Sequence, residues 1–193
     1  LNSLSDYCSN DEMMMLDANQ GWSIEEALKY LKVLENYNFS WIEEPISALS
    51  NKDEFNNIIN STNCNLAFGE NINKLDDLIF LAHNNKLSYL QPDLTKYGGI
   101  SLIRNLSKKI QSNKIWMHFL GGGVGLLTSA HLMSAINPSA FLETDINVNP
   151  LRTSLFRNEI KIEGGKINFN DEPGIGGPLD FDTIDKYLIS SHT

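Results

Sequence analysis

The segment Trp41-Ile42-Glu43-Glu44-Pro45 places two acids directly after a short apolar run, a pattern typical of the end of a buried strand. The same arrangement recurs along the chain, where apolar runs end in a polar residue at Asp17, Glu43, Glu70, Asp93, His118 and Glu143. Successive end residues lie 23 to 27 positions apart. This near-constant spacing indicates a repeated structural unit, and short continuous apolar runs are typical of buried parallel strands.

The segments between the runs have the spacing of amphipathic helices. Ser23 and Glu26 match a capping box at the start of the first of them. Asn73 is expected to cap another helix. Further helices are expected from Ile100 to Ile110 and from Val124 onwards, after the run Gly121-Gly122-Gly123. Alternating strands and helices predict an α/β fold with a parallel sheet.

Two closures of such a sheet compete. A doubly wound sheet uses few strands at its ligand site, whereas a (β/α) barrel gathers residues from the ends of many strands. Six strand ends with ionisable residues favour the barrel. Because a full barrel needs eight strands, we expect an incomplete TIM-type barrel, about strands three to eight, over residues 1–150. Residues 151–193 are expected to form a tail that packs back, with a hairpin around Gly164-Gly165.

Composition excludes several classes of protein. The 193 residues carry 15 Lys and Arg against 24 Asp and Glu, a net charge of −9. This balance argues against nucleic acid or an anionic membrane as the partner. No apolar run reaches membrane-span length, and the first residues lack the basic-then-apolar pattern of a signal peptide. Two cysteines make no disulfide framework, so a reduced, cytoplasmic setting is expected. Cys8 and Cys64 are expected to be packing residues, and the absent initiator Met suggests a piece of a longer protein.

Three of the strand-end acids predict a metal site. Asp17, Glu43 and Glu70 would face one cavity from neighbouring strands, where carboxylates repel one another unless they are protonated or neutralised by a cation. An all-oxygen set favours a hard ion, Mg²⁺ or alternatively Mn²⁺. Taken singly, each acid could instead cap a helix or lie in solvent. Three further residues are candidates to hold the ligands in place: Asn19, Glu44 and Asn71.

The next two strand ends predict a general acid/base pair. A carboxylate at Asp93 would orient the imidazole of His118 and raise its basicity. Glu143 could hydrogen-bond a substrate oxygen, and Lys96 could line the cavity or lie in solvent. The other histidines are expected to have structural roles: His83, His131 and His192. A glycosidase carboxylate pair is the weaker alternative, because it leaves the third acid and the Asp/His pair without roles.

Five motifs in this order resemble the enolase superfamily, and its mandelate racemase subgroup with many acid-sugar dehydratases in particular. They are Asp17-Ala-Asn-Gln-Gly-Trp, Trp41-Ile-Glu-Glu-Pro, Gly69-Glu-Asn, Gln91-Pro-Asp-Leu-Thr-Lys-Tyr-Gly-Gly and the His118 segment. The resemblance implies metal ligands at Asp17, Glu43 and Glu70, a base pair at Asp93 and His118, and an electrophilic or substrate-binding Glu143. The muconate-lactonizing subgroup usually has Lys at the position of Asp93, so cycloisomerisation ranks below dehydration and racemisation.

The resemblance also implies parts that these residues lack: a capping α+β domain and two earlier barrel strands. Two hypotheses follow. The first is Mg²⁺-dependent removal of the proton α to the carboxylate of a hydroxy or sugar acid, giving a metal-stabilised enediolate that leads to dehydration or racemisation. The second is a catalytically incompetent metal-binding fragment that needs its missing half. Barrels of this family often assemble, so a homo-oligomer is a further expected partner.

Overall fold

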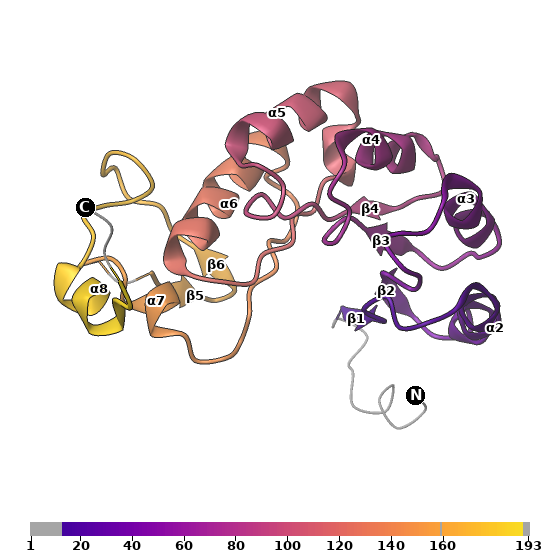
Figure 1. Ribbon diagram of the computed structural model, residues 1–193, viewed down its shortest axis with the longest axis horizontal. Helices are drawn as coiled ribbons and strands as arrows, with labels where there is room; N and C mark the ends of the chain where they lie inside the picture. Colours follow the sequence, from indigo (N-terminus) through magenta and orange to yellow (C-terminus); the bar gives the residue numbers. More distant parts are fainter. Residues whose placement is uncertain (1–12, 159, 191–193) are drawn as a thin grey trace.

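The computed structural model describes residues 13–158 and 160–190. Within them, parallel strands pair in the order β1 (Met14–Asp17), β2 (Phe39–Glu43), β3 (Leu66–Phe68) and β4 (Tyr89–Leu90). A helix follows each strand: α2 (Ile24–Leu34), α3 (Lys52–Asn60), α4 (Leu75–His83) and α5 (Ile100–Lys109), before η1 (Ser112–Lys114) and α6 (Gly123–Ile136). Figure 1 shows α2 and α3 on the outer side of the strands, at the right of the view, and the β-α order confirms the expected units of a partial barrel.

Two of the six expected strands are absent from the described residues. The run Ile115–His118 makes one bridge, between Leu90 and Ile115, and Phe141–Glu143 forms no strand. A strand requires a neighbour with which to exchange backbone hydrogen bonds. The amide of Trp116 donates to the Leu90 carbonyl at 2.9 Å, but no further described strand lies beside this segment. The His118 segment therefore follows the sheet as an extended chain.

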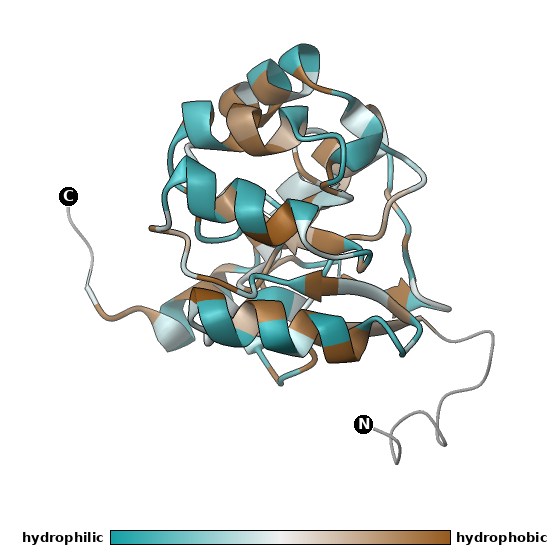
Figure 2. Cartoon of the chain, turned by 90° about the vertical axis from the view of Figure 1, so that its right-hand side faces the viewer, coloured by the Kyte–Doolittle hydropathy of each residue, from teal (hydrophilic) through white to brown (hydrophobic). Residues whose placement is uncertain are grey.

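Apolar helix faces and the strands form one core. The buried cluster includes Leu31 of α2, Ile58 of α3, Leu78 of α4 and Ile103 of α5, each fully enclosed. Figure 2 shows the complementary pattern, with hydrophilic residues on the outer faces of these helices. Burial of such faces, at about 25 cal/mol per Å² of apolar area, holds the helices against the sheet. No helix in the described ranges is both long and apolar enough to cross a bilayer.

The helix starts confirm one expected cap and correct another. The Ser23 amide donates to Glu26 at 2.9 Å and the Glu26 amide donates to the Ser23 hydroxyl at 3.3 Å, which completes the capping box. The expected Asn73 cap is wrong, because Lys74 is the N-cap of α4 and makes no side-chain cap bond. Asn73 lies one position too early to reach the free amides of the first turn.

The tail packs against α6. After α7 (Pro150–Thr153), strands β5 (Ile162–Glu163) and β6 (Lys166–Ile167) form the expected antiparallel hairpin, and α8 (Phe181–Tyr187) follows. The His131 ring of α6 stacks on Phe169, with ring centroids 4.1 Å apart. The boundary expected after residue 150 falls within α7 and stays a prediction. Cys8 and His192, both expected to have structural roles, lie outside the described residues.

Gly69 lets the end of β3 approach the next strand. Its φ of +146° is a conformation that other residues rarely adopt, and a Cβ there would lie 2.7 Å from the backbone nitrogen of Gln91. The backbone of Gln91 cannot yield, because its amide donates to the Phe68 carbonyl at 2.8 Å. This close approach sets the positions of both Glu70 and Gln91.

We expect Gly69→Ala to lower the free energy of unfolding by about 2–4 kcal/mol, from backbone strain and the contact with Gln91. Urea unfolding followed by circular dichroism measures this change. The matched control is Gly165→Ala in the hairpin, where φ is +73° and a Cβ would meet nothing within 4 Å. That variant should lose only about 1 kcal/mol. Equal losses in the two variants would contradict the close-approach explanation.

Candidate active site

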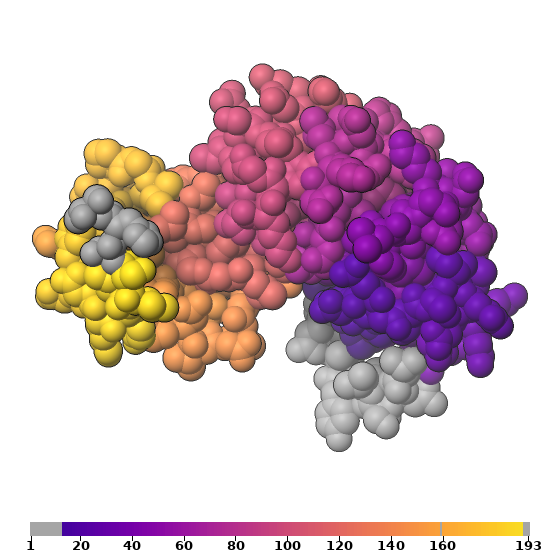
Figure 3. All heavy atoms as spheres, in the orientation of Figure 1, coloured from indigo at the N-terminus to yellow at the C-terminus, as the bar shows by residue number. Residues whose placement is uncertain are grey.

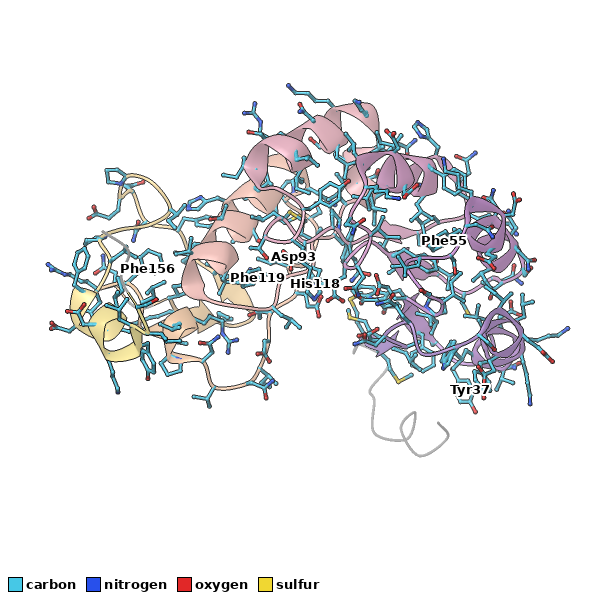
Figure 4. The ribbon with its side chains drawn as sticks, viewed as in Figure 1. Tyr37, Phe55, Asp93, His118, Phe119 and Phe156 are labelled. Atoms are coloured by element: carbon cyan, nitrogen blue, oxygen red, sulfur yellow. The ribbon has the colours of Figure 1, made fainter. Side chains whose placement is uncertain are left out.

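Parallel register brings the strand-end acids to one edge of the sheet. Asp17 and Glu43 are direct partners in the β1–β2 pairing. Glu70 follows β3 after Gly69, and Asp93 follows β4 by three residues. Since parallel strands all end at the same edge, acids that lie far apart in the chain become neighbours. Figure 4 shows Asp93 and His118 side by side near the middle of the molecule.

Glu43 is a buried carboxyl with two donors on one oxygen. The Gln91 side-chain amide donates to Glu43 Oε2 at 3.0 Å, and the Trp41 indole donates to the same oxygen at 3.3 Å. Burial, together with the negative charges of Glu143 and Asp17, raises the pKa of Glu43 to about 7, although the Gln91 bond opposes this shift. Without a nearby cation, the Glu43 carboxyl therefore stays protonated up to a higher pH than an ordinary glutamate does.

Asp93 and His118 form a buried hydrogen-bonded pair. The Nδ1 atom of His118 lies 3.0 Å from Asp93 Oδ2, and both side chains are 1–2% exposed. The other Asp93 oxygen accepts from the Thr95 hydroxyl at 2.6 Å and the Thr95 amide at 2.7 Å. Burial opposes ionisation of Asp93, but these bonds outweigh it and lower its pKa. The carboxylate is thus held ionised beside the imidazole.

The second nitrogen of His118 faces two further acids. Its Nε2 atom lies 3.3 Å from Glu70 Oε1 and 3.8 Å from Glu143 Oε2. Burial alone would lower the pKa of His118, but the bond to Asp93 and the charges of Glu143 and Glu70 raise it. Burial also raises the pKa of Glu143, against the opposing effect of His118. The structure therefore brings together four predicted site residues: Glu70, Asp93, His118 and Glu143.

The remaining predicted residues contact acids along the same edge of the sheet. Asn71 donates to Glu44 twice, from its backbone amide at 3.0 Å and its side-chain amide at 2.7 Å. Asn19 donates to Asp17 Oδ1 at 2.7 Å through its backbone amide, rather than its side chain. Glu44 therefore holds the loop after Glu70, and Asn19 holds Asp17. Lys96, expected either at the cavity or in solvent, pairs with Glu70 at 2.5 Å.

A cavity of about 430 Å³ joins the acids to an aromatic wall. Asp17, Glu43 and Glu143 line it together with Trp41, Trp116 and Phe141. The Trp116 ring packs edge-on against Phe141 and Trp41, with centroid separations of 5.6 and 5.8 Å. Figure 3 shows the molecule indented between the β1–α2 part in indigo and the orange segment after α6. The cavity is therefore walled by residues from both parts of the chain.

The three predicted metal ligands are divided between two groups in this structure. Asp17 and Glu43 line the cavity, whereas Glu70 contacts Lys96 and His118. Among residues 13–158 and 160–190, no three His, Cys, Asp or Glu side chains are gathered closely enough to hold a metal ion. The donor chemistry nevertheless fits a hard cation, since all the groups are carboxylates and Glu43 is destabilised as an anion.

Sequence reasoning missed the role of Gln91. Its side-chain amide orients Glu43, and its other side-chain atom, Oε1, is buried without a hydrogen-bond partner. The sequence did carry a signal, because Gln91 lies two positions before Asp93, and alternate residues of a strand face the same side. Trp41 stands in the same relation to Glu43. Both residues were visible within motifs, but their hydrogen bonds depend on the fold.

The stability of the divalent-free chain should fall as pH rises from about 4.5 to 7. A raised pKa means that folded Glu43 keeps a proton that the unfolded chain has already lost. Unfolding then releases this proton, so higher pH favours the unfolded state, at a cost of up to about 3 kcal/mol. His118 and Glu143, whose pKa values are also raised, contribute in the same direction. Glu43→Gln should flatten the curve.

Urea unfolding at several pH values in the presence of a chelator measures this dependence. The matched control is Glu163→Gln, at an exposed position on β5, which should keep the parent's slope. If Glu43→Gln and the parent lose stability equally over the same pH range, the Glu43 carboxyl is not the source of the effect.

Comparisons with known proteins place this site in context. Residues 2–183 match the family described as enolase C-terminal domain-like. The chain is 24% identical to arabinonate dehydratase of Saccharolobus solfataricus. The match covers 99% of this chain and 51% of that enzyme. A solved mandelate racemase/muconate lactonizing enzyme from Bordetella bronchiseptica superposes with a TM-score of 0.82 at 29% identity, over 95% of this chain and 52% of that one.

A third comparison shows the same fold at lower identity. A racemase of Streptomyces coelicolor, solved with bound magnesium, has a TM-score of 0.78 and 20% identity over 96% of this chain and 49% of its own. The chain thus spans about half the length of the relatives it matches.

Proposed function

Because the chain belongs to the enolase C-terminal domain-like family, we propose that it carries the site at which the proton α to a carboxylate is removed. The substrate class is a hydroxy or sugar acid, and the outcome is dehydration or racemisation. Asp93 rather than Lys in the strand-end position ranks cycloisomerisation lower. A small-molecule acid as the partner, homo-oligomeric assembly and a cytoplasmic location stay predictions.

The buried Asp93–His118 pair is the observation that supports this proposal most strongly. Asp93 fixes the imidazole through Nδ1 at 3.0 Å, which leaves Nε2 directed at Glu70 and Glu143. In its neutral form, His118 would take the α-proton at Nε2, while Asp93 stabilises the resulting imidazolium. For dehydration, the same Nε2–H would then be given to the departing β-hydroxyl, which leaves as water.

Asp17, Glu43 and Glu70 would hold Mg²⁺, or Mn²⁺ in its place. When bound, the cation would supply positive charge for the substrate carboxylate as the α-proton is lost. Trp41 and Gln91 orient Glu43 through its Oε2 atom, and the Asn19 amide orients Asp17. Glu143, which is 40% exposed and lies 3.8 Å from His118 Nε2, would hydrogen-bond a substrate oxygen.

The second candidate is a metal-binding half that is inactive alone. Its support is the length of the relatives, of which this chain spans about half. The open cavity agrees with it, because Phe141 in its wall is 55% exposed. Deuterium exchange at the α-carbon separates the two candidates. Exchange by this chain alone supports the first, and cation binding without exchange supports the second.

His118→Asn should lower α-proton exchange of the substrate acid by about 10²–10⁴-fold, because no base remains at this position. Asp93→Asn should lower the rate less and move the rise of the pH–rate profile to lower pH, because the carboxylate that raises the pKa of His118 is gone. The measurement is proton NMR of candidate acids in ²H₂O with Mg²⁺, using the longest form of the protein that shows exchange.

The matched control is His83→Asn, since His83 is exposed on α4 and its Nδ1 lies against the Ile79 carbonyl. This variant should exchange at the parent rate. Parent-like exchange by His118→Asn would remove the proposed base. An unchanged pH profile in Asp93→Asn would remove the proposed role of Asp93.

A further inference from the structure

Two nitrogen atoms from different side chains lie close to a single oxygen of Glu70. Lys96 Nζ lies 2.5 Å from Glu70 Oε1, and His118 Nε2 lies 3.3 Å from the same atom. Lys96 Nζ also donates to the Asn71 side-chain oxygen at 3.5 Å. The Glu70 side chain is 15% exposed, whereas that of Lys96 is 45% exposed. The ammonium thus covers the outer side of a largely enclosed carboxylate.

The backbone positions Lys96 for this contact. Its amide lies 3.4 Å from Asp93 Oδ1, in the turn that Thr95 also fixes through Asp93. The same carboxylate that orients His118 therefore also anchors the start of the Lys96 side chain. Asp93 thus helps to position both nitrogen atoms that lie beside Glu70 Oε1.

This arrangement conflicts with metal ligation by Glu70. A divalent cation at Oε1 would lie against the Lys96 ammonium, and like charges about 4 Å apart repel strongly even at an effective dielectric of 20. The observed division agrees with this conflict, because Asp17 and Glu43 line the cavity without Glu70. Glu70 Oε1 is therefore open to an ion shared with Asp17 and Glu43 only when the Lys96–Glu70 pair separates.

We infer that Lys96 is an internal counter-ion that competes with the divalent cation for Glu70, so that cation binding and release of Lys96 are one coupled event. The inference rests on the proposed function, which assigns Glu70 as a ligand. If the Lys96–Glu70 ion pair must separate before the cation binds, the free energy of that ion pair is subtracted from the binding free energy of the cation. Half-exposed pairs of this kind are weak, so the effect is modest and its sign is the diagnostic quantity.

The test is the affinity of the chain for Mn²⁺, measured by titration calorimetry and by the paramagnetic signal of free Mn²⁺. Lys96→Met should bind the ion about two- to fivefold more tightly than the parent. Lys96→Gln is the second variant, and circular dichroism verifies that both fold. The matched control is Lys86→Met, which removes the same charge before β4, at the opposite end of the strand, where Nζ donates to the Asn60 carbonyl.

A double-mutant cycle with Glu70→Gln separates competition from a general loss of positive charge. Glu70→Gln alone should weaken Mn²⁺ binding, and adding Lys96→Met should then give no gain. A gain that persists in the Glu70→Gln background overturns the inference, as does unchanged or weaker binding by Lys96→Met. If Glu70→Gln leaves affinity unchanged, or if the parent binds no Mn²⁺, the proposed ligand role fails and the inference fails with it.

Discussion

Parallel pairing of β1 to β4 determines where the strand-end acids of this fold lie. The register that sets Asp17 opposite Glu43 also sets Glu43 opposite Ala67, so that Glu70 follows one strand further on. Each crossover helix returns the chain to the same end of the sheet, and each strand then delivers its polar end to the same edge. The strands themselves are only two to five residues long. Helix burial therefore carries most of the stability of the sheet.

This arrangement gathers several acidic side chains where they are partly or fully buried from water. A buried carboxylate is tolerated when it accepts hydrogen bonds or lies beside a cation. Asp93 has both, from Thr95 and His118, and its pKa is lowered. Glu43 accepts from Gln91 and Trp41 but has no ion-pair partner among the described residues, and its pKa is raised to about 7. The two carboxyls lie near each other in the fold but are expected to differ in charge around neutral pH.

Much of this edge of the sheet was predictable from the sequence. The regular spacing of the strand ends, together with the residue types found there, predicted the Asp93–His118 pair, since the ends of adjacent parallel strands lie side by side. The expected strands at Ile115–His118 and Phe141–Glu143 were not formed, because a strand depends on a partner that local sequence does not specify. The Asn73 cap failed by one residue, which is within the usual uncertainty of helix ends. The ion pair between Lys96 and Glu70 is a tertiary contact, and the spacing of the two residues in the sequence does not predict it.

The site has a charge imbalance that a proton or a cation can relieve. Glu70, Asp93 and Glu143 surround His118, with Lys96 beside Glu70, while Asp17 and Glu43 line the cavity together with Glu143. Part of the imbalance is met by protons, as the raised pKa values of Glu43, Glu143 and His118 indicate. A divalent ion would relieve the same repulsion and would expel the protons from groups it contacts. Protonation, the ion pair with Lys96 and cation binding are therefore three alternative ways to reduce the repulsion between these carboxylates. This shared electrostatic origin links the pH dependence of stability to the chemistry proposed for the site.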